Sequence, residues 1–190
     1  MGTAREFQAE KLVVPVLISC REHKEALLKE LSAAFGPRDF LSEELDFDFS
    51  SYYDKEMGKP IRRFFVSFRD LIDPGRLAEV KLRTGIVEQR FRSSGNRCIN
   101  LDPGCLSLSR FILASTKDSS HRIPLRSGIY AEITLMYEHG RFRPLEWTYP
   151  DYRSPAYRRI LGEIRTLYKQ QLRGYSPSGF KPEASASPPR

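Results

Sequence analysis

Acidic, basic and amide side chains, together with one imidazole, are concentrated between residues 100 and 132, where they interrupt short apolar runs. The set comprises Asn100, Asp102, Ser115, Thr116, Lys117, Asp118, Ser119, Ser120, His121, Arg122, Tyr130 and Glu132. Polar residues on loops that rigid strands carry often bind ligands, although the same residue types also build solvated turns. No nucleophile and base stand at a recognisable spacing, so the region predicts a ligand site without naming a reaction.

The cations and the imidazole of this region predict an anionic ligand. Lysine offers a point charge, arginine a planar fork of donors, and histidine titrates near neutral pH. We therefore expect ligand-binding roles for Asn100, Lys117, Asp118 and Arg122, and the candidate catalytic residues are His121, Asp102 and Glu132. The alternative, a solvated loop built by the turn residues STKDSSH, stays open.

Glu132 lies in the middle of an expected strand, on the face shared with Tyr130 and Thr134. A carboxylate there is either exposed or paired with a base such as Arg63 or Lys117. The alternating pattern of the strand favours the exposed position.

Two acids that alternate along another expected strand, Asp46 and Asp48, are weak candidates for a metal site. Together with Asp54 and Glu56 they could offer oxygen ligands to Mg²⁺ or Ca²⁺, but the chain has no EF-hand spacing. Alternating acids are more typical of the solvated face of a strand.

The sequence does not identify a cofactor. It contains no GxxxxGK(S/T) phosphate loop, which excludes a P-loop GTPase despite the string STKD. Three scattered cysteines, Cys20, Cys98 and Cys105, have no CxxC spacing, so neither a zinc site nor a disulfide framework is expected. Unpaired cysteines fit the reducing cytoplasm.

The composition predicts one globular domain. The chain has 190 residues, 40% of them hydrophobic, and no apolar run that reaches the ~18 residues of a membrane span. The start of the chain carries charges instead of an apolar signal segment, so we expect a soluble cytoplasmic protein with no membrane partner. From Arg141 onward there are ten Lys or Arg against four Asp or Glu, which accounts for six of the seven net positive charges. A solvated helix face explains this better than a nucleic-acid surface.

The first half of the chain predicts alternating strands and helices. Strands are expected at 11–19, 45–49, 61–68 and 97–101, and helices at 22–35 and from the cap Asp73 to about residue 93. Pro15 indicates an edge or a bulge for the first strand. The order strand, helix, strand, strand, helix, strand is that of a ferredoxin-like βαββαβ core.

The second half predicts an extension of this core. It contains a short apolar segment at 110–115, strands at 121–125 and 129–137, a return at 141–147 and a helix that begins after the cap Ser154 and ends at Gly174. The fold class is therefore α+β, with added antiparallel strands and a C-terminal helix. We expect a flexible N-terminus at 1–10, a single domain at 11–174 and a disordered tail at 175–190.

Four segments together carry a resemblance to a known family. The segments are DFDFSSYYDKEMG, NLDPGCLSLSRFILASTKDSSHRI, GIYAEITLMY and WTYPDYRS. In this order they resemble the uncharacterised bacterial family called domain of unknown function 4416, over about residues 10 to 173. The resemblance implies that the polar motifs belong together, and it implies no substrate, cofactor or catalytic residue.

Two functions of different classes follow. The first is the binding of an anionic, nucleotide-like or phosphorylated ligand by the polar residues between Asn100 and Glu132, with hydrolase or transferase chemistry as an option. The second is a non-catalytic module that binds RNA or a protein partner through the basic C-terminal helix and the aromatic loop WTYPDYRS. The sequence does not decide whether the protein is an enzyme.

Overall fold

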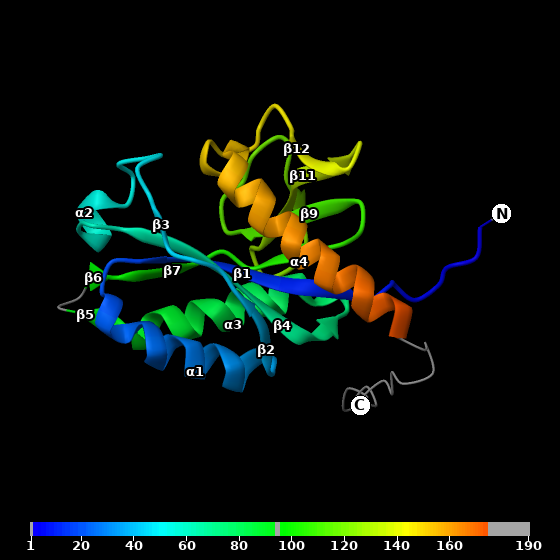
Figure 1. The fold of residues 1–190 in the computed structure, drawn as a ribbon. Coiled ribbons are helices and arrows are strands. Elements are labelled where there is room, and N and C mark those ends of the chain that lie inside the picture. Colours follow the sequence, from blue (N-terminus) through cyan, green and yellow to red (C-terminus); the bar gives the residue numbers. More distant parts are fainter. Residues whose placement is uncertain (1, 94–95, 175–190) are drawn as a thin grey trace, which may run out of the picture.

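The computed structural model describes residues 2–93 and 96–174, so the expected tail at 175–190 lies outside the described residues. The protein is α+β, with helices packed on both faces of a large antiparallel sheet (Figure 1). None of the described helices is long and apolar enough to cross a membrane.

The elements of the first half are two long helices and the strands around them. In chain order they are β1 (Glu10–Ile18), α1 (Lys24–Phe35), β2 (Arg38–Leu41), β3 (Leu45–Asp46), α2 (Asp54–Met57), β4 (Arg62–Ile72) and α3 (Leu77–Arg90). A 3-10 turn precedes α1 at Arg21–His23 and another precedes α3 at Pro74–Arg76. The predicted cap is present, because Asp73 Oδ1 accepts a hydrogen bond from the Gly75 amide at 2.8 Å.

The second half adds short strands and one long helix. In chain order they are β5 (Arg92–Ser93), β6 (Asn96–Arg97), β7 (Ile99–Leu101), β8 (Gly104–Leu106), β9 (Arg110–Ser115), β10 (Ile123–Pro124), β11 (Tyr130–Glu138), β12 (Arg141–Pro144), a 3-10 turn (Asp151–Arg153) and α4 (Pro155–Gly174). The main sheet has the order β10-β11-β9-β8-β1-β4-β2, with β12 beside β11, β3 beside β4, and β7 beside β1.

β1 is buried on both faces because helices cover both sides of the sheet. Its residues Leu12, Val14, Val16 and Ile18 pack with α1 and α3, whereas Val13 belongs to the core under α4. Figure 1 shows α1 and α3 on one side of the sheet and α4 across the other. This two-sided burial explains why the strand reads as a nearly continuous apolar run.

The expectation that Pro15 marks a sheet edge is wrong, since β1 is a central strand. Pro15 pairs with Phe65 of β4, and its carbonyl accepts a hydrogen bond from the Asp102 amide at 3.0 Å on the other side. The nitrogen of Pro15, which carries no hydrogen, therefore faces the interruption between β7 and β8. At this point the sheet requires no hydrogen bond from Pro15.

The region between α1 and β4 also differs from expectation. The strand predicted at 45–49 is only the two-residue β3, the edge strand β2 was not predicted, and the segment 50–60 that follows contains the one-turn helix α2. Phe47 leaves the strand because its ring is buried against Met57 and Ile61, which folds the segment back over the sheet. This folded-back segment forms one wall of the site described below.

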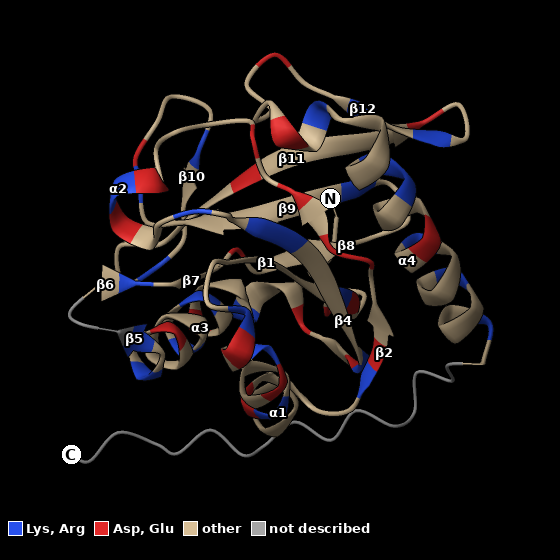
Figure 2. Ribbon diagram, turned by 60° about the vertical axis from the view of Figure 1, so that its left-hand side comes forward, with Lys and Arg blue, Asp and Glu red and all other residues tan. Residues whose placement is uncertain are grey.

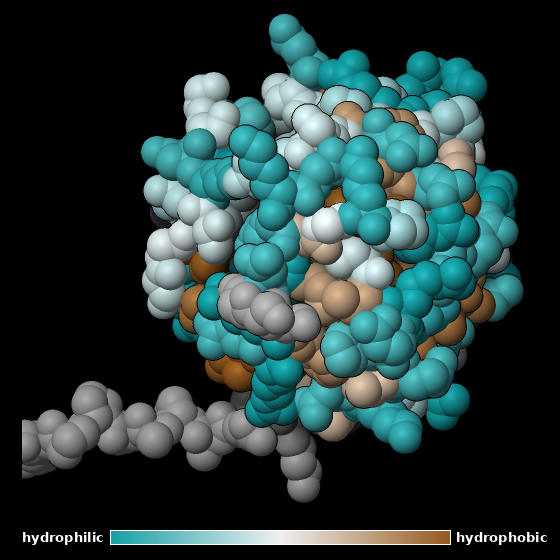
Figure 3. Space-filling view, turned by 90° about the vertical axis from the view of Figure 1, so that its left-hand side faces the viewer, coloured by the Kyte–Doolittle hydropathy of each residue, from teal (hydrophilic) through white to brown (hydrophobic). Residues whose placement is uncertain are grey.

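Charged residues are mixed over the surface. Figure 2 shows basic and acidic residues on the same helices, α1, α3 and α4. The face in Figure 3, where α2 and β6 lie, is mostly hydrophilic, with apolar surface showing between the polar residues.

Candidate functional site

A cavity of about 850 Å³ lies where segments from the first and the second half of the chain meet. Its lining residues come from the segment 47–53, β4, α3, β6, β7 and the turn after it, the end of β9 and the residues that follow, the start of β11, and the segment 149–152. The cavity is in the size range of small-molecule sites, and several distant segments must fold together to build it.

The pairing of β9 explains where the cavity opens. β9 pairs with β8, from Gly104 opposite Leu113 to Leu106 opposite Phe111, while β7 pairs with β1 alone. The chain steps sideways at Asp102 and Pro103, and the Pro103 carbonyl takes the last hydrogen bond, from Ala114. Beyond Ala114 the two halves of the sheet therefore separate, and Ser115 to Lys117 line the cavity.

The floor of the cavity is built around Arg63, which is 2% exposed. Its two terminal nitrogens donate to Asp102 at 3.1 Å and to Asp151 at 3.2 Å. Phe47, Tyr152 and Tyr157 surround the guanidinium, with ring centroids 5.5 to 5.9 Å from its central carbon. A buried guanidinium held by two carboxylates and surrounded by three rings is restrained in position, although its Nε has no hydrogen-bond partner among the described residues.

The two carboxyl groups on Arg63 have pKa values that move in opposite directions. Burial raises the pKa of Asp151, and the nearby Arg63 offsets this only in part. Burial also opposes ionisation of Asp102, but Arg63, Lys81 and the Asn100 amide together hold the pKa of that carboxyl below its ordinary value. Two differently tuned acids in one cavity are typical of functional sites.

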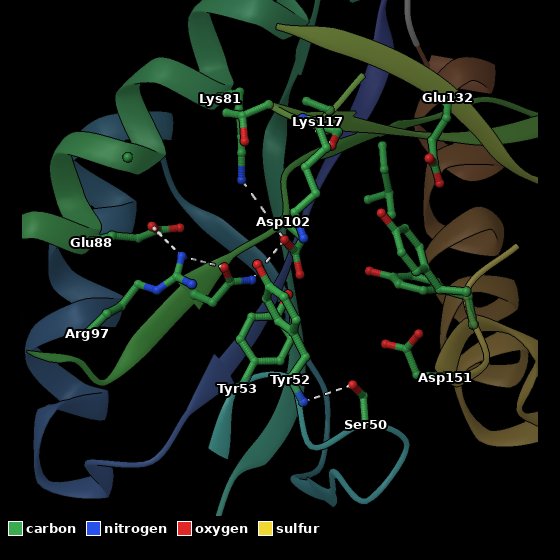
Figure 4. A pocket seen from close by; sticks show the side chains of 18 of the residues that line it. Ser50, Tyr52, Tyr53, Lys81, Glu88, Arg97, Asp102, Lys117, Glu132 and Asp151 are labelled. Carbon is green, nitrogen blue, oxygen red and sulfur yellow. Dashed lines mark hydrogen bonds and ion pairs between the residues drawn. The ribbon is translucent and has the colours of Figure 1, made fainter. Parts of the chain in front are cut away.

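Asp102 is linked through Asn100 to a second arginine. The Asn100 amide donates to Asp102 Oδ1 at 2.8 Å, and its oxygen accepts from Arg97 at 2.9 Å. Lys81 reaches the same place from α3, where its Nζ donates to the Leu101 carbonyl at 2.7 Å and lies 4.0 Å from Asp102. Figure 4 shows these side chains converging on Asp102.

Glu132 is buried, so the prediction of an exposed position is wrong. Its Oε2 accepts from Arg122 Nε at 2.7 Å and lies 3.3 Å from His121 Nε2. The pairing of β11 with β9 shifts register between Ile133 and Leu135, and the predicted solvent face of β11 turns inward. The base that pairs with Glu132 is Arg122, not Arg63 or Lys117.

His121 and Arg122 contact Glu132 but do not line the cavity. The His121 ring stacks on Trp147, with centroids 5.3 Å apart and planes 14° apart. Arg122 also donates to the Lys117 carbonyl at 2.8 Å and to the Tyr149 hydroxyl. These two residues therefore fix the carboxylate of Glu132 and the loop that carries Lys117.

Lys117 lines the cavity and makes no ion pair with any residue that the structure describes. Its Nζ lies 4.1 Å from the centroid of the Tyr52 ring. The other cavity cations, Arg63, Lys81 and Arg97, each lie within 4.0 Å of a carboxylate. Lys117 is thus the cation whose charge is still available to a ligand.

The structure brings most of the predicted site residues together. Asn100, Asp102, Lys117 and Glu132 line the cavity, and His121 and Arg122 contact Glu132. Asp118 does not line the cavity. The weak metal candidates Asp46 and Asp48 do not line it either, and Asp46 pairs with Arg62. Within residues 2–93 and 96–174 no group of three or more His, Cys, Asp or Glu side chains is placed to hold a metal ion.

Sequence reasoning missed part of the floor. Arg63 was considered only as a partner of Glu132, and Lys81, Asp151 and the cavity role of Tyr152 were not predicted. A signal for Arg63 exists, since a charged residue inside the apolar strand IRRFFVSF needs buried partners. Asp151 gave no such signal, because an acid before a capped helix is ordinary.

Comparison with known proteins gives one family. The sequence profile described as Domain of unknown function (DUF4416) matches residues 8–168. No curated protein and no solved structure matches the chain.

Proposed function

The chain belongs to the family described as Domain of unknown function (DUF4416), and we propose that it binds a planar anionic small molecule, nucleotide-like or phosphorylated, in the cavity. The observation that carries this proposal is the convergence of Asn100, Asp102, Lys117 and Glu132 with aromatic rings around one space of about 850 Å³. Such spaces, largely apolar with a few polar groups that converge, are typical of small-molecule sites.

The walls suit a flat ring system. Tyr52, Tyr53, Tyr149 and Tyr152 line the cavity, and Leu82, Ile86, Leu113, Ala114 and Ile129 add apolar surface. Aromatic side chains bind planar ligands by stacking or by edge contacts. The ring of the ligand would lie among these side chains.

The anionic group of the ligand is assigned to Lys117. Because the cavity cations Arg63, Lys81 and Arg97 already lie beside carboxylates, Lys117 can neutralise a phosphate without breaking an existing ion pair. The ligand is thus anionic, as the sequence predicts, and its charged group would lie beside Lys117.

If the bound ligand reacts, by hydrolysis or group transfer, the acids that can touch it are Asp102 and Glu132, since both line the cavity. His121 would act through Glu132 as a positioning residue, because its ring contacts that carboxylate from outside the cavity. If the protein binds the ligand without a reaction, neither Asp102 nor Glu132 needs to act as an acid or a base.

The proposed site sits on what we infer to be a ferredoxin-like core. The strand order β8-β1-β4-β2, with α1 between β1 and β2 and α3 after β4, supports this inference. β9 to β12 and α4 would be additions that close the cavity. We also propose a cytoplasmic location, supported by the three free cysteines.

The alternative, a module that binds RNA or protein through α4, has less support. Arg159 pairs with Glu43 and Glu163, and Arg165 donates to the Leu108 carbonyl. The aromatic loop is also occupied, because Trp147 stacks on His121 and donates to the Ile133 carbonyl. Few of these groups are free to meet a partner.

A thermal-shift screen tests the proposal. Nucleotides and sugar phosphates are compared with their unphosphorylated counterparts on the wild-type protein, on Lys117→Ala and on the α4 control Lys169→Ala. Since a ligand that prefers the folded state raises the melting temperature, at least one phosphorylated compound should stabilise the wild type and the control but not Lys117→Ala. The proposal fails if no compound raises the melting temperature, or if Lys117→Ala responds as the wild type does.

A further inference from the structure

Tyr152 has a buried hydroxyl that makes no hydrogen bond with any residue that the structure describes. The side chain is 2% exposed and lines the cavity. Burying a hydroxyl without a hydrogen-bond partner destabilises the folded protein, and a hydrogen bond with a bound molecule would offset this cost.

Asp151, the preceding residue in the chain, presents an acceptor to the same cavity. Its Oδ2 accepts from Arg63 at 3.2 Å and backbone amides of Asp151 and Tyr152 also face the carboxylate, but no side chain within the described part of the chain donates to its Oδ1. Figure 4 shows the carboxyl group of Asp151 directed into the cavity. One residue thus offers an acceptor and its neighbour a donor, both fixed by packing around Arg63.

We propose that Asp151 and Tyr152 form a specificity subsite for the edge of an amino-substituted heterocycle. In this subsite Asp151 accepts a hydrogen bond from the amino group, and the Tyr152 hydroxyl donates to the adjacent ring nitrogen. The inference rests on the proposed function, because it describes the buried end of the ligand whose anionic end lies at Lys117.

The position of Arg63 makes this subsite selective. Its guanidinium holds Asp151 on one side and lies 5.9 Å from the ring of the buried Tyr152, which restricts the movement of both side chains when the ligand lacks a matching group. Sites with fixed polar groups reject ligands that leave those groups unpaired.

Tyr157 provides a matched control. Its hydroxyl is also buried without a partner, and its ring also lies 5.9 Å from the Arg63 guanidinium, but Tyr157 does not line the cavity. Lack of a partner alone therefore does not define the subsite. Removal of the Tyr152 hydroxyl should leave the melting temperature unchanged or slightly higher, because this hydroxyl makes no hydrogen bond with the described residues, whereas Tyr157→Phe also removes a weak contact with Arg63.

The experiment measures calorimetric affinities for two matched pairs of nucleotides. Adenosine 5′-monophosphate is compared with purine riboside 5′-monophosphate, and guanosine 5′-monophosphate with inosine 5′-monophosphate, so that each pair differs by one amino group. In at least one pair the amino compound should bind the wild type about tenfold or more tightly. Tyr152→Phe and Asp151→Asn should remove most of this difference, Tyr157→Phe should keep it, and Lys117→Ala should weaken both members of the pair equally.

The outcomes separate this inference from the proposed function. Equal binding of both members of each pair to the wild type overturns the subsite and leaves the proposed function intact. Binding by none of the four nucleotides overturns the subsite, and the broader thermal-shift screen then decides the proposed function by itself. An equal loss of discrimination in Tyr157→Phe would show that the cluster acts through packing, which also overturns the subsite.

Discussion

Asp102 and Asp151 lie 49 positions apart in the sequence and are held by the two terminal nitrogens of one guanidinium, that of Arg63, at 3.1 and 3.2 Å. Asp102 comes from the turn between β7 and β8, and Asp151 comes from the turn before α4. Arg63 of β4 therefore joins the turn after β7 and the turn before α4 at the floor of the cavity. The floor of the cavity is therefore fixed by buried contacts between distant segments of the chain.

Removal of Arg63 should destabilise the protein strongly. Arg63→Ala leaves the buried Asp151 without its cation and Asp102 with Lys81 alone, which should cost about 3 to 5 kcal/mol of unfolding free energy. Arg62→Ala on the same strand is the control, because Arg62 pairs with the exposed Asp46 and lies 3.9 Å from Glu44, which keeps Lys24 and Arg21, so its loss should cost about 1 kcal/mol or less. Denaturant unfolding of both variants checks this, and equal small effects would contradict the role of Arg63.

The opposite pKa shifts of the two carboxyl groups predict opposite effects on stability as the pH changes. The pKa of Asp102 is lowered, so its contribution is present above its ordinary value of 3.8 and is lost as the pH falls through the lowered pKa. The pKa of Asp151 is raised by burial, so its contribution is present below 3.8 and is lost as the pH rises through the raised pKa.

The variants Asp102→Asn and Asp151→Asn separate these two contributions. Unfolding free energies between pH 3 and pH 6 should fall less on acidification in Asp102→Asn than in the wild type, and less on raising the pH in Asp151→Asn. Identical pH profiles for the wild type and both variants would show that the two groups titrate normally.

Lys117 and His121 should respond differently to substitution, although both belong to the predicted loop. Lys117→Ala removes no ion pair within the described residues and should leave the melting temperature unchanged while it abolishes ligand binding. His121→Ala removes the contact with Glu132 and the stacking on Trp147, so it should lower the melting temperature. A drop of equal size in both variants would assign Lys117 a structural role.

The C-terminal helix should depend on its apolar stripe and not on its charges. Leu161 and Ile164 are fully buried, so Leu161→Ala or Ile164→Ala should cost about 2 to 5 kcal/mol of unfolding free energy. Arg158→Ala removes only long hydrogen bonds to the Ser154 and Phe142 carbonyls and should have a small effect. A denaturant midpoint that moves equally in all three variants would contradict this packing.

The elements with a clear periodic pattern could be predicted from the sequence. The apolar stripes of α1, α3 and α4 and the buried run of β1 are visible as residue spacing, because the local period follows the geometry of each element. The short strands β2 and β8 have too few residues to show a period, whereas β10 lies inside the strand predicted at 121–125. The position of Pro15 at the centre of the sheet depends on the break between β7 and β8, which no local pattern contains.

The candidate site was predicted where its residues are neighbours in the sequence. The region from Asn100 to Glu132 supplies one side of the cavity, and its density of polar residues is visible in the sequence. The other side comes from Arg63, Asp151 and the tyrosines, which only the tertiary fold brings to the same place. The burial of Glu132 was missed for a similar reason, since it follows from a register shift between two strands.

Methyl-labelled NMR spectra test the central claim most directly. Adenosine and guanosine 5′-monophosphate are added in turn to the protein, and the methyl resonances of the cavity residues Leu82, Ile86, Leu113, Ala114 and Ile129 are followed beside those of Ile160, Leu161 and Ile164 under α4. We predict saturable shifts of the cavity methyls with at least one nucleotide, little change under α4, and loss of the shifts in Lys117→Ala. Shifts confined to the α4 methyls, or shifts of the cavity methyls that persist in Lys117→Ala, would contradict the assignment of this cavity as the anionic-ligand site.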